Sequence, residues 1–110
     1  MECAQAVTKY IRISPRKARL AAGLIKGLPV SAALSQLEFS PLRGSRLLKK
    51  TLTSAIANAE MQLDIAKEKM VVVTVKIDCG PVLKRSKPKN RGGQHAILKR
   101  TSHFTVVVGG

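Results

Sequence analysis

The residues of this sequence best equipped for chemistry are its Lys and Arg side chains, and their chemistry is the binding of anions. Twenty of them stand against six Asp and Glu residues, so the 110-residue chain carries a formal net charge of +14. Because such a surface repels itself unless a polyanion neutralises it, nucleic acid is the expected partner. A membrane is not expected, since no apolar run approaches the roughly 20 residues that span a bilayer. The first residues, Met1 to Ala4, also lack the pattern of a secretory signal, so we expect the protein to stay in the compartment where it is made.

Three clusters hold most of the positive charge, and we predict that they bind nucleic acid. The first cluster consists of Lys9, Arg12, Arg16, Lys17, Arg19 and Lys26, the second of Arg43, Arg46, Lys49 and Lys50, and the third of Lys84, Arg85, Lys87, Lys89, Arg91, Lys99 and Arg100. Any one such run can also be a solvated face, so each cluster needs a further argument.

The second cluster lies in the first turns of a predicted helix. The positive end of the helix dipole is there, and each cation near it costs about 0.3–1 kcal/mol. Arg43, Arg46 and Lys50 are spaced i, i+3 and i+7, so they share one stripe. A stripe that opposes the dipole indicates an external anion, and phosphate is the natural one.

The third cluster lies in an unusually long connection. Roughly a dozen polar and basic residues (84–95) separate two apolar strands, whereas hairpin connections usually have about two to five residues. Pro88 is not expected to join a strand ladder, and Asn90 with Gly92-Gly93 suits a tight reversal. A floppy surface loop is one interpretation; the other is a β-arm at about 80–98, reaching roughly 30 Å at about 3.3 Å per residue. Inside RNA, such an arm would be covered and its cations would meet phosphates.

Catalytic and metal-binding arrangements are not evident. The six acidic residues are scattered, and Ser102 and His103 occupy adjacent strand positions that point to opposite faces, which excludes a local nucleophile pair. Cys3 and Cys79 form no CxxC motif, and two histidines give no zinc-ligand spacing. We therefore predict no enzyme, no metal and no cofactor; both cysteines should be reduced, Cys79 should be a small apolar strand residue, and His103 should be structural or contact RNA.

Strands are predicted where apolar residues alternate. Residues 5–13 form the first, with Val7, Ile11 and Ile13 on its buried side. Residues 70–79 form the second, with Val71, Val73, Val75, Ile77 and Cys79 on one side, and residues 96–108 form the third.

Three helices are predicted between the first two strands. The first begins at Ser14-Pro15, buries Leu20, Ala21, Leu24 and Ile25, and is closed by Gly27 and Pro29. The second covers about 30–38, and the longest runs from a cap at Ser40-Pro41 to about Leu63, with Leu48, Leu52, Ile56, Ala59 and Leu63 as its apolar stripe. Because helices and strands are segregated, we predict a single α+β domain (1–110): three helices packed on a three-stranded antiparallel sheet, with a long protruding β-hairpin.

Several motifs resemble a known family. SAIANAE (54–60), DCGP (78–81) followed by Lys84-Arg85, ILKRTSHFTVVV (97–108) and RKARL (16–20) are similar, in order, to segments of the bacterial large-subunit ribosomal proteins numbered twenty-two. The similarity covers essentially the whole chain. It implies a structural protein of the ribosome, cytoplasmic or in an organelle, that binds large-subunit ribosomal RNA and neighbouring ribosomal proteins.

The resemblance also implies a role for the hairpin. In this family the hairpin threads through ribosomal RNA, and its tip helps to line the exit tunnel of the nascent polypeptide. The corresponding tip residues here are Ser86, Lys87, Pro88, Lys89, Asn90, Arg91, Gly92, Gly93 and Gln94. Residues 83–85 match the segment that, in the family, influences how macrolide antibiotics are accommodated. The tip of this chain differs from versions that carry a hydrophobic residue.

An architectural DNA-binding protein with a basic β-arm is the alternative from another class. Such arms bend duplex DNA with an apolar wedge in the minor groove, and Pro88 could be that wedge. Those proteins need a dimer to present two arms, and the motifs fit the ribosomal family better. Strong preference for kinked duplex DNA over ribosomal RNA would favour this alternative, and a hydrolase would require activity that His103→Ala abolishes.

Overall fold

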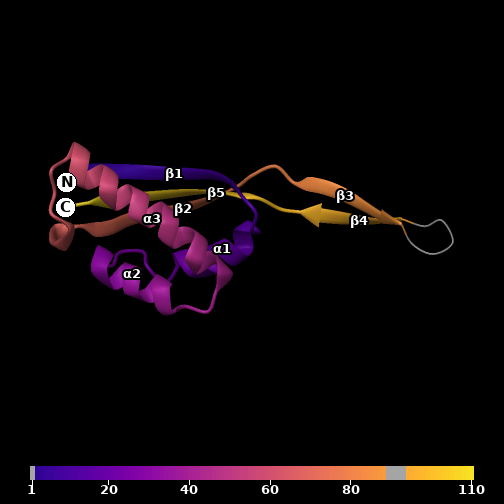
Figure 1. Ribbon diagram of the computed structural model, residues 1–110, viewed down its shortest axis with the longest axis horizontal. Helices are drawn as coiled ribbons and strands as arrows, with labels where there is room; N and C mark the ends of the chain where they lie inside the picture. Colours follow the sequence, from indigo (N-terminus) through magenta and orange to yellow (C-terminus); the bar gives the residue numbers. More distant parts are fainter. Residues whose placement is uncertain (1, 89–93) are drawn as a thin grey trace.

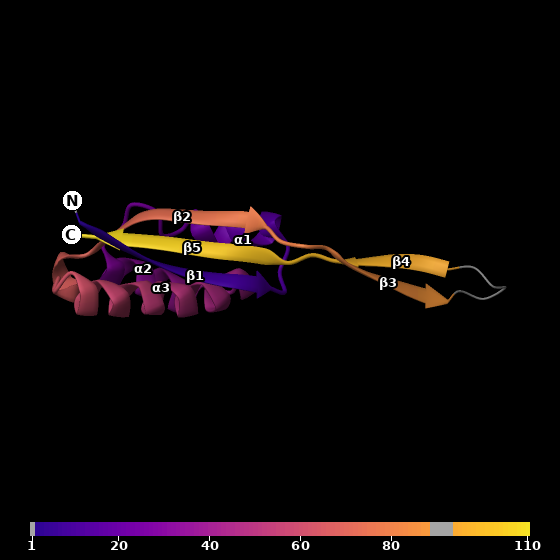
Figure 2. The same ribbon diagram turned by 90° about the horizontal axis from the view of Figure 1, so that it is seen from above.

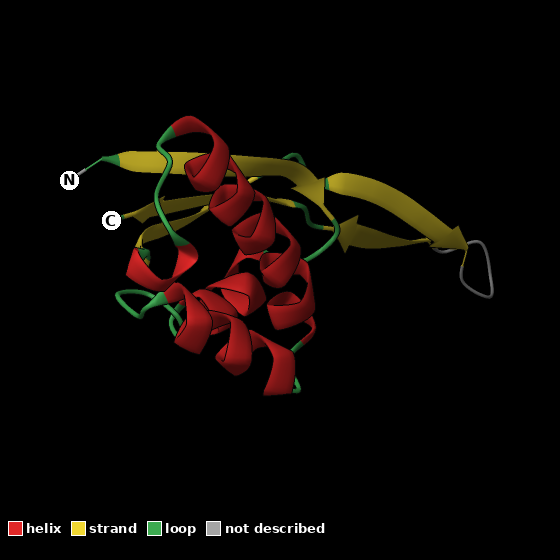
Figure 3. Ribbon diagram, turned by 60° about the vertical axis from the view of Figure 1, so that its left-hand side comes forward, coloured by secondary structure: helices red, strands yellow, loops and turns green. Residues whose placement is uncertain are grey.

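The protein consists of a two-layer body and a long hairpin. The computed structural model describes residues 2–88 and 94–110, of which 83–88 and 94–99 are described by their backbone alone. The elements in chain order are β1 (Cys3–Ile11), α1 (Pro15–Ala22), α2 (Val30–Phe39), α3 (Arg43–Gln62), the 3-10 helix η1 (Lys67–Lys69), β2 (Val71–Cys79), β3 (Leu83–Pro88), β4 (Gln94–Lys99) and β5 (Ser102–Gly109). The helices cover one face of the sheet of the body (Figures 1 and 3).

The sheet of the body has the strand order β1-β5-β2, and both pairings are antiparallel. The strands β3 and β4 pair with each other in a separate two-stranded sheet. Figure 2 shows this hairpin, which we call the arm, leaving the body in line with β2 and β5. The predicted α+β fold with three helices, a three-stranded antiparallel sheet and a protruding hairpin is therefore confirmed.

The core lies between α3 and the central strand β5. From α3, Leu48 and Leu52 are completely buried, as the predicted stripe requires, and Phe104 and Val106 of β5 are buried against the helical layer. A part-buried hydrogen bond also joins the helix to the sheet, since the buried Thr51 Oγ1 donates to Thr8 Oγ1 of β1 at 2.9 Å. Long apolar side chains thus join α3 to the sheet along the body.

The predicted buried side of β1 is wrong in its first half. Ala4 and Ala6 face the core, whereas Val7 is 47% exposed. Tyr10 has a φ of 59°, and the pairing with β5 shifts register between Thr8 and Ile11. Such a bulge inserts one residue and inverts the alternation, so Ile13 is buried as predicted although Val7 is not.

The same mechanism affects β2. The predicted alternation puts Val72 and Ile77 on opposite sides of the strand, yet both are buried, because the pairing with β5 shifts register between Val72 and Thr74. Val73, inside the shift, is only half-buried. At the end of the strand, Cys79 is exposed rather than packed in the core.

The predicted apolar face of α1 is half right: Ala21 and Ile25 are buried as predicted, whereas the two leucines are not. Leu20 is 61% and Leu24 is 39% exposed, whereas Ala18, Ala21 and Ala22 are buried together with Ile25. The alanines and Ile25 also follow the spacing i, i+3, i+4 and i+7, so the sequence offers two possible faces. The alanine face is selected because α3 crosses α1 closely at Gly44, where an added Cβ would lie 3.4 Å from Ala21 Cβ.

The start of α3 differs from the prediction by two residues. Ser40 does not cap the helix, which begins at Arg43 after the N-cap residue Leu42 and has no side-chain cap. The Ser40 Oγ instead accepts hydrogen bonds from the Leu42 amide at 3.3 Å and from Ser45 Oγ at 2.8 Å. By contrast, Ser14 caps α1 as predicted, since its Oγ accepts from the Lys17 amide at 3.4 Å.

Candidate RNA interface at the root of the arm

Residues of all three basic clusters meet where the arm leaves the body. We call the connecting segments 80–82 and 100–101 the arm root. β1 ends, α1 begins and α3 begins at this end of the sheet (Figure 1). Arg12, Lys17, Arg43 and Arg100 line one pocket there, with a volume of about 520 Å³ and no acidic side chain in its wall. We call it the cation pocket.

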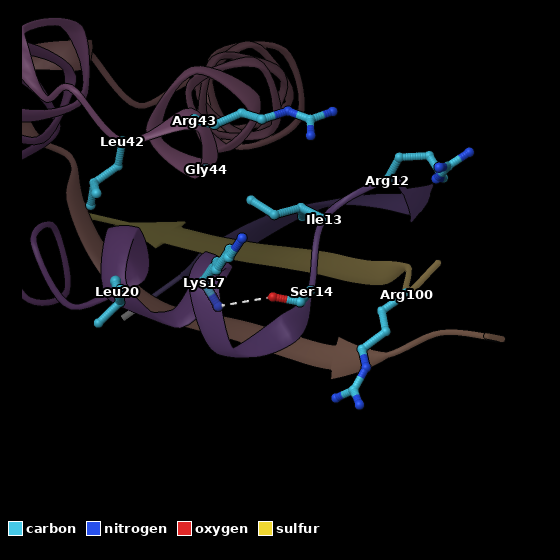
Figure 4. A pocket seen from close by; sticks show the side chains of 9 residues that line it. All are labelled: Arg12, Ile13, Ser14, Lys17, Leu20, Leu42, Arg43, Gly44 and Arg100. Carbon is cyan, nitrogen blue, oxygen red and sulfur yellow. Dashed lines mark hydrogen bonds between the residues drawn. The ribbon is translucent and has the colours of Figure 1, made fainter. Parts of the chain in front are cut away.

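Figure 4 shows how the side chains of the cation pocket are arranged. Arg12 and Arg43 extend outward in similar directions from the end of β1 and the start of α3. Lys17 rises from α1, and Arg100, which belongs to the arm root, extends on the other side, away from Arg12 and Arg43. The remaining wall is largely apolar and includes Ile13, Leu20 and Leu42.

A second hollow lies directly at the arm root. It has a volume of about 220 Å³ and is lined by Arg16, Arg19 and Arg100, so Arg100 is shared with the cation pocket. Arg19 is partly committed to the fold, because its Nη2 donates to the carbonyl oxygen of Ile77 at 3.1 Å. We call the combined surface the arm-end face; its cations are Arg12, Arg16, Lys17, Arg19, Arg43 and Arg100.

The other cations of the second cluster extend this surface along α3. Arg46 and Lys49 line a neighbouring hollow of about 390 Å³, which also contains Glu38, and Lys50 is exposed one turn further on. The first turn of α3 contains no acidic residue. Among the residues whose side chains are described, the single ion pair joins Lys76 and Asp78 at 3.8 Å, so the cations of the arm-end face have no carboxylate partner within this part of the chain.

The third cluster lies mainly on the arm. Lys84, Arg85 and Lys87 belong to β3, and Lys99 belongs to β4. Of the predicted tip residues, Ser86, Lys87 and Pro88 form the second half of β3 and Gln94 is the first residue of β4, whereas Lys89, Asn90, Arg91, Gly92 and Gly93 lie outside the described residues. Contrary to expectation, Pro88 joins the ladder, opposite Gln94; it is the last residue of β3, where a missing amide hydrogen is tolerated.

The arm gives the molecule an elongated shape. The principal extents are 62 × 25 × 16 Å, and the radius of gyration is 16.9 Å. A compact domain of this length would have a radius of gyration of about 13 Å. The excess comes from the arm, which projects beyond the helical layer (Figure 2).

Hydrogen bonds between the two chain segments hold the arm root together. The Gly80 amide donates to the Thr101 carbonyl at 3.0 Å, and Thr101 Oγ1 donates to the Pro81 carbonyl at 2.7 Å. A Cβ atom at position 80 would overlap Thr101 Oγ1 and lie 3.1 Å from His103 Cε1. Glycine is therefore required here by close approach, and the predicted strand 96–108 is divided at this root into β4 and β5.

His103 has a structural role on the outer face of β5. Its Nδ1 accepts a hydrogen bond from the Tyr10 amide at 3.1 Å, and the two rings meet edge to face with centroids 5.0 Å apart. His103 thus supports the bulge in β1. Ser102 points to the opposite face, as predicted, where its Oγ donates to the Ile13 carbonyl at 2.7 Å.

Five residues of the cation pocket, among them two leucines, are missing from the binding residues that the sequence predicts. The apolar pattern places Leu20 on the buried face of the first helix and Leu42 within the third helix, but both leucines line the pocket. The sequence does contain a signal for Leu20: if the alternative alanine face of α1 is taken as the buried face, Leu20 is predicted to be exposed. Lys26, in contrast, is separated from its cluster, because the adjacent Gly27 amide bonds to the Val72 carbonyl at the far end of β2.

The structure also bears on two other classes of site. Within residues 2–88 and 94–110, no set of three His, Cys, Asp or Glu side chains is grouped closely enough to hold a metal ion. None of the helices in this described part has both the length and the apolar character needed to cross a bilayer.

Comparison with known proteins places the chain among ribosomal proteins. The family model of ribosomal protein L22p/L17e matches residues 6–109. The large ribosomal subunit protein uL22 of Protochlamydia amoebophila is 69% identical over 108 residues, which cover 98% of this chain and 97% of the relative. The proteins of the same name from Chlamydia pneumoniae and Chlamydia abortus are 57% and 56% identical, each over 96% of this chain and 95% of the relative.

Proposed function

The chain belongs to the ribosomal protein L22p/L17e family, and we propose that its arm-end face and its arm are the surfaces that bind large-subunit ribosomal RNA. As a member of this family it is a structural, non-enzymatic constituent of the large ribosomal subunit, where it assembles with ribosomal RNA and with other ribosomal proteins. The histone-like alternative is set aside by the same membership.

The observation that carries this proposal is the convergence of cations in the cation pocket. Arg12 and Lys17, Arg43, and Arg100 come from three separate parts of the sequence, yet they line one pocket without an acidic side chain. Concentrated positive charge of this kind binds phosphates and releases their counterions. The energetic cost of Arg43 at the start of α3 is then offset by an external anion.

The arm extends the interface away from the body. Its two strands pair only with each other, and β3 contains Lys84, Arg85 and Lys87. Surrounding ribosomal RNA would cover the open edges of this narrow hairpin and neutralise its charge. We infer that the tip, residues 86–94, helps to line the exit tunnel and meets the nascent polypeptide, as in the family.

Crosslinking tests the proposed interface. Ultraviolet irradiation of assembled ribosomes, followed by identification of the crosslinked peptides and nucleotides, should join peptides of the arm-end face to large-subunit ribosomal RNA. Crosslinked peptides confined to the opposite end of the body, around η1, would contradict the proposed interface. Crosslinks to genomic DNA in cells would restore the histone-like alternative.

A further inference from the structure

Leu20 is an exposed apolar residue in a strongly basic surface. It is 61% exposed, although it lies on α1 together with Arg16, Lys17 and Arg19. It faces the cation pocket, whose wall also includes Leu42, 36% exposed, and Ile13. Phosphate alone would use the cations and leave these leucines in water, so the pocket matches a ligand with both a charged part and an apolar part.

The size of the cation pocket fits a ligand of that kind. Its volume of about 520 Å³ falls within the roughly 300–1,000 Å³ of small-molecule pockets. Leu20 and Leu42 lie at one side of the pocket, Arg12 and Arg100 lie at the opposite side, and Lys17 stands between them (Figure 4). A nucleotide has the same two parts: a flat base whose faces are weakly polar, and a charged phosphate.

We propose that the cation pocket holds one unstacked nucleotide of ribosomal RNA, with its base against Leu20 and Leu42 and its phosphates against Arg12, Lys17 and Arg43. The inference rests on the proposed function, because the nucleotide belongs to the RNA that the arm-end face binds. RNA is favoured over an acidic segment of a neighbouring protein because the pocket opens onto a continuous series of cations that leads to the arm root. Recognition of unpaired, splayed nucleotides is common in protein–RNA interfaces.

The pocket holds the base by contact and not by its hydrogen-bonding pattern. Ser14 supplies the one uncharged polar side chain of the wall, and its Oγ already accepts the Lys17 amide. No carboxylate or carboxamide lines the pocket to read the edge of a base.

Substitution of Leu20 tests the base contact. The probe is full-length large-subunit ribosomal RNA, and its affinity for the full chain is measured at several salt concentrations. Leu20→Ser should weaken binding about three- to tenfold, the scale of one base contact, and should leave the salt dependence unchanged because every cation that meets a phosphate is still present. Leu20→Met should retain the affinity of the parent chain. The matched control is Met61→Ser, which removes another exposed apolar side chain (86% exposed) from the far end of α3.

Arg43→Gln distinguishes a failure of the nucleotide proposal from a failure of the proposed RNA interface. It should weaken binding and also flatten the salt dependence, because the variant neutralises one phosphate fewer. If Arg43→Gln acts in this way while Leu20→Ser behaves like Met61→Ser, the nucleotide pocket is wrong and the RNA interface stands. If neither variant differs from the control, the interface itself is wrong.

Site-specific crosslinking identifies the occupant. Photoreactive p-benzoylphenylalanine replaces Leu20, an exposed position that tolerates a larger side chain, and the variant is assembled into large subunits. A crosslink to one ribosomal RNA nucleotide without a Watson–Crick partner is the expected result. A crosslink to a neighbouring protein, a crosslink to base-paired nucleotides, or no crosslink to RNA would overturn the proposal.

Discussion

Arg43 occupies a position that is unfavourable for the isolated protein. It is the first residue of α3, where the helix dipole is positive, and that turn contains no acidic residue and no side-chain cap. Arg46 lies one turn further on, and Lys50 continues the same stripe. These residues are explained by an anion outside the chain, because nothing in the first turn of the helix balances them.

Changing Arg43, Arg46 and Lys50 to Gln should therefore weaken RNA binding without lowering the stability of the fold. The free energy of unfolding should stay constant or rise by up to about 1 kcal/mol, because repulsion by the helix dipole is relieved. The affinity for ribosomal RNA should fall, because three cations that bind phosphate are absent. Urea denaturation and RNA binding measure the two effects, and a less stable variant with unchanged RNA affinity would count against an external phosphate.

The identities of the binding residues are easier to predict than their arrangement. Clustered charge in the sequence is enough to select Arg12, Lys17, Arg43 and Arg100. Their meeting in one pocket depends on the close crossing of α1 and α3 at Gly44 and on the register of β5, which are tertiary features. The apolar wall could not be predicted for the same reason. Leu20 fits a buried helix face equally well, and only the packing of α1 on α3 shows that the alanine face is the buried one.

At the scale of elements, the arm root joins two parts, the body and the arm, that are stabilised by different contacts. The body has its own core, whereas β3 and β4 pair only with each other. Periodicity predicts the order and type of the elements well. It fails on the faces of β1 and β2, because the bulges after Thr8 and Val72 leave no signal in the alternation of apolar residues.

Gly80→Ala should disturb the arm root. The new methyl group would overlap Thr101 Oγ1 and contact His103, so the two segments of the root must separate. We expect the free energy of unfolding to fall by about 1–3 kcal/mol, as for overpacking at other tight sites, together with weaker RNA binding.

Gly23→Ala is the matched control for this substitution. Gly23 has a helical φ of −63°, and an added Cβ would be no closer than 3.6 Å to its neighbours. Its replacement should be neutral or stabilise the protein by up to about 1 kcal/mol. Equal stability of the two alanine variants would show that the arm root is not closely packed.

Deletion of residues 86–94 should leave the body folded. The described strands of the arm, β3 and β4, pair only with each other, so the free energy of unfolding should change by no more than about 0.5 kcal/mol. Much of the affinity for ribosomal RNA should remain, because the arm-end face is intact. Loss of cooperative unfolding in the shortened chain would mean that the arm is part of the core.

At the scale of the whole molecule, charge is distributed unevenly along the long axis. Four of the six acidic residues lie at the end away from the arm, near the chain termini and η1: Glu2, Glu60, Asp64 and Glu68. The arm and the arm-end face carry cations at the opposite end (Figure 1). A charge gradient of this kind orients the chain toward RNA with the arm first.

Two triple variants with the same change in net charge distinguish an RNA interface at the arm root from binding by net charge alone. The pocket variant replaces Arg12, Lys17 and Arg43 of the cation pocket with Gln. The far-end variant replaces Lys26, Lys67 and Lys69, which are exposed at the far end of the body, also with Gln. The affinity of each full-length variant for large-subunit ribosomal RNA is measured as a function of salt concentration.

We expect the pocket variant to bind at least about tenfold more weakly and its salt slope to fall by about two to three units, since each phosphate that is no longer neutralised lowers the slope by about 0.9. The far-end variant should retain its affinity within about threefold and its slope within about one unit. Equally weak binding by the two variants would show that net charge alone governs affinity, and would contradict an RNA interface at the root of the arm.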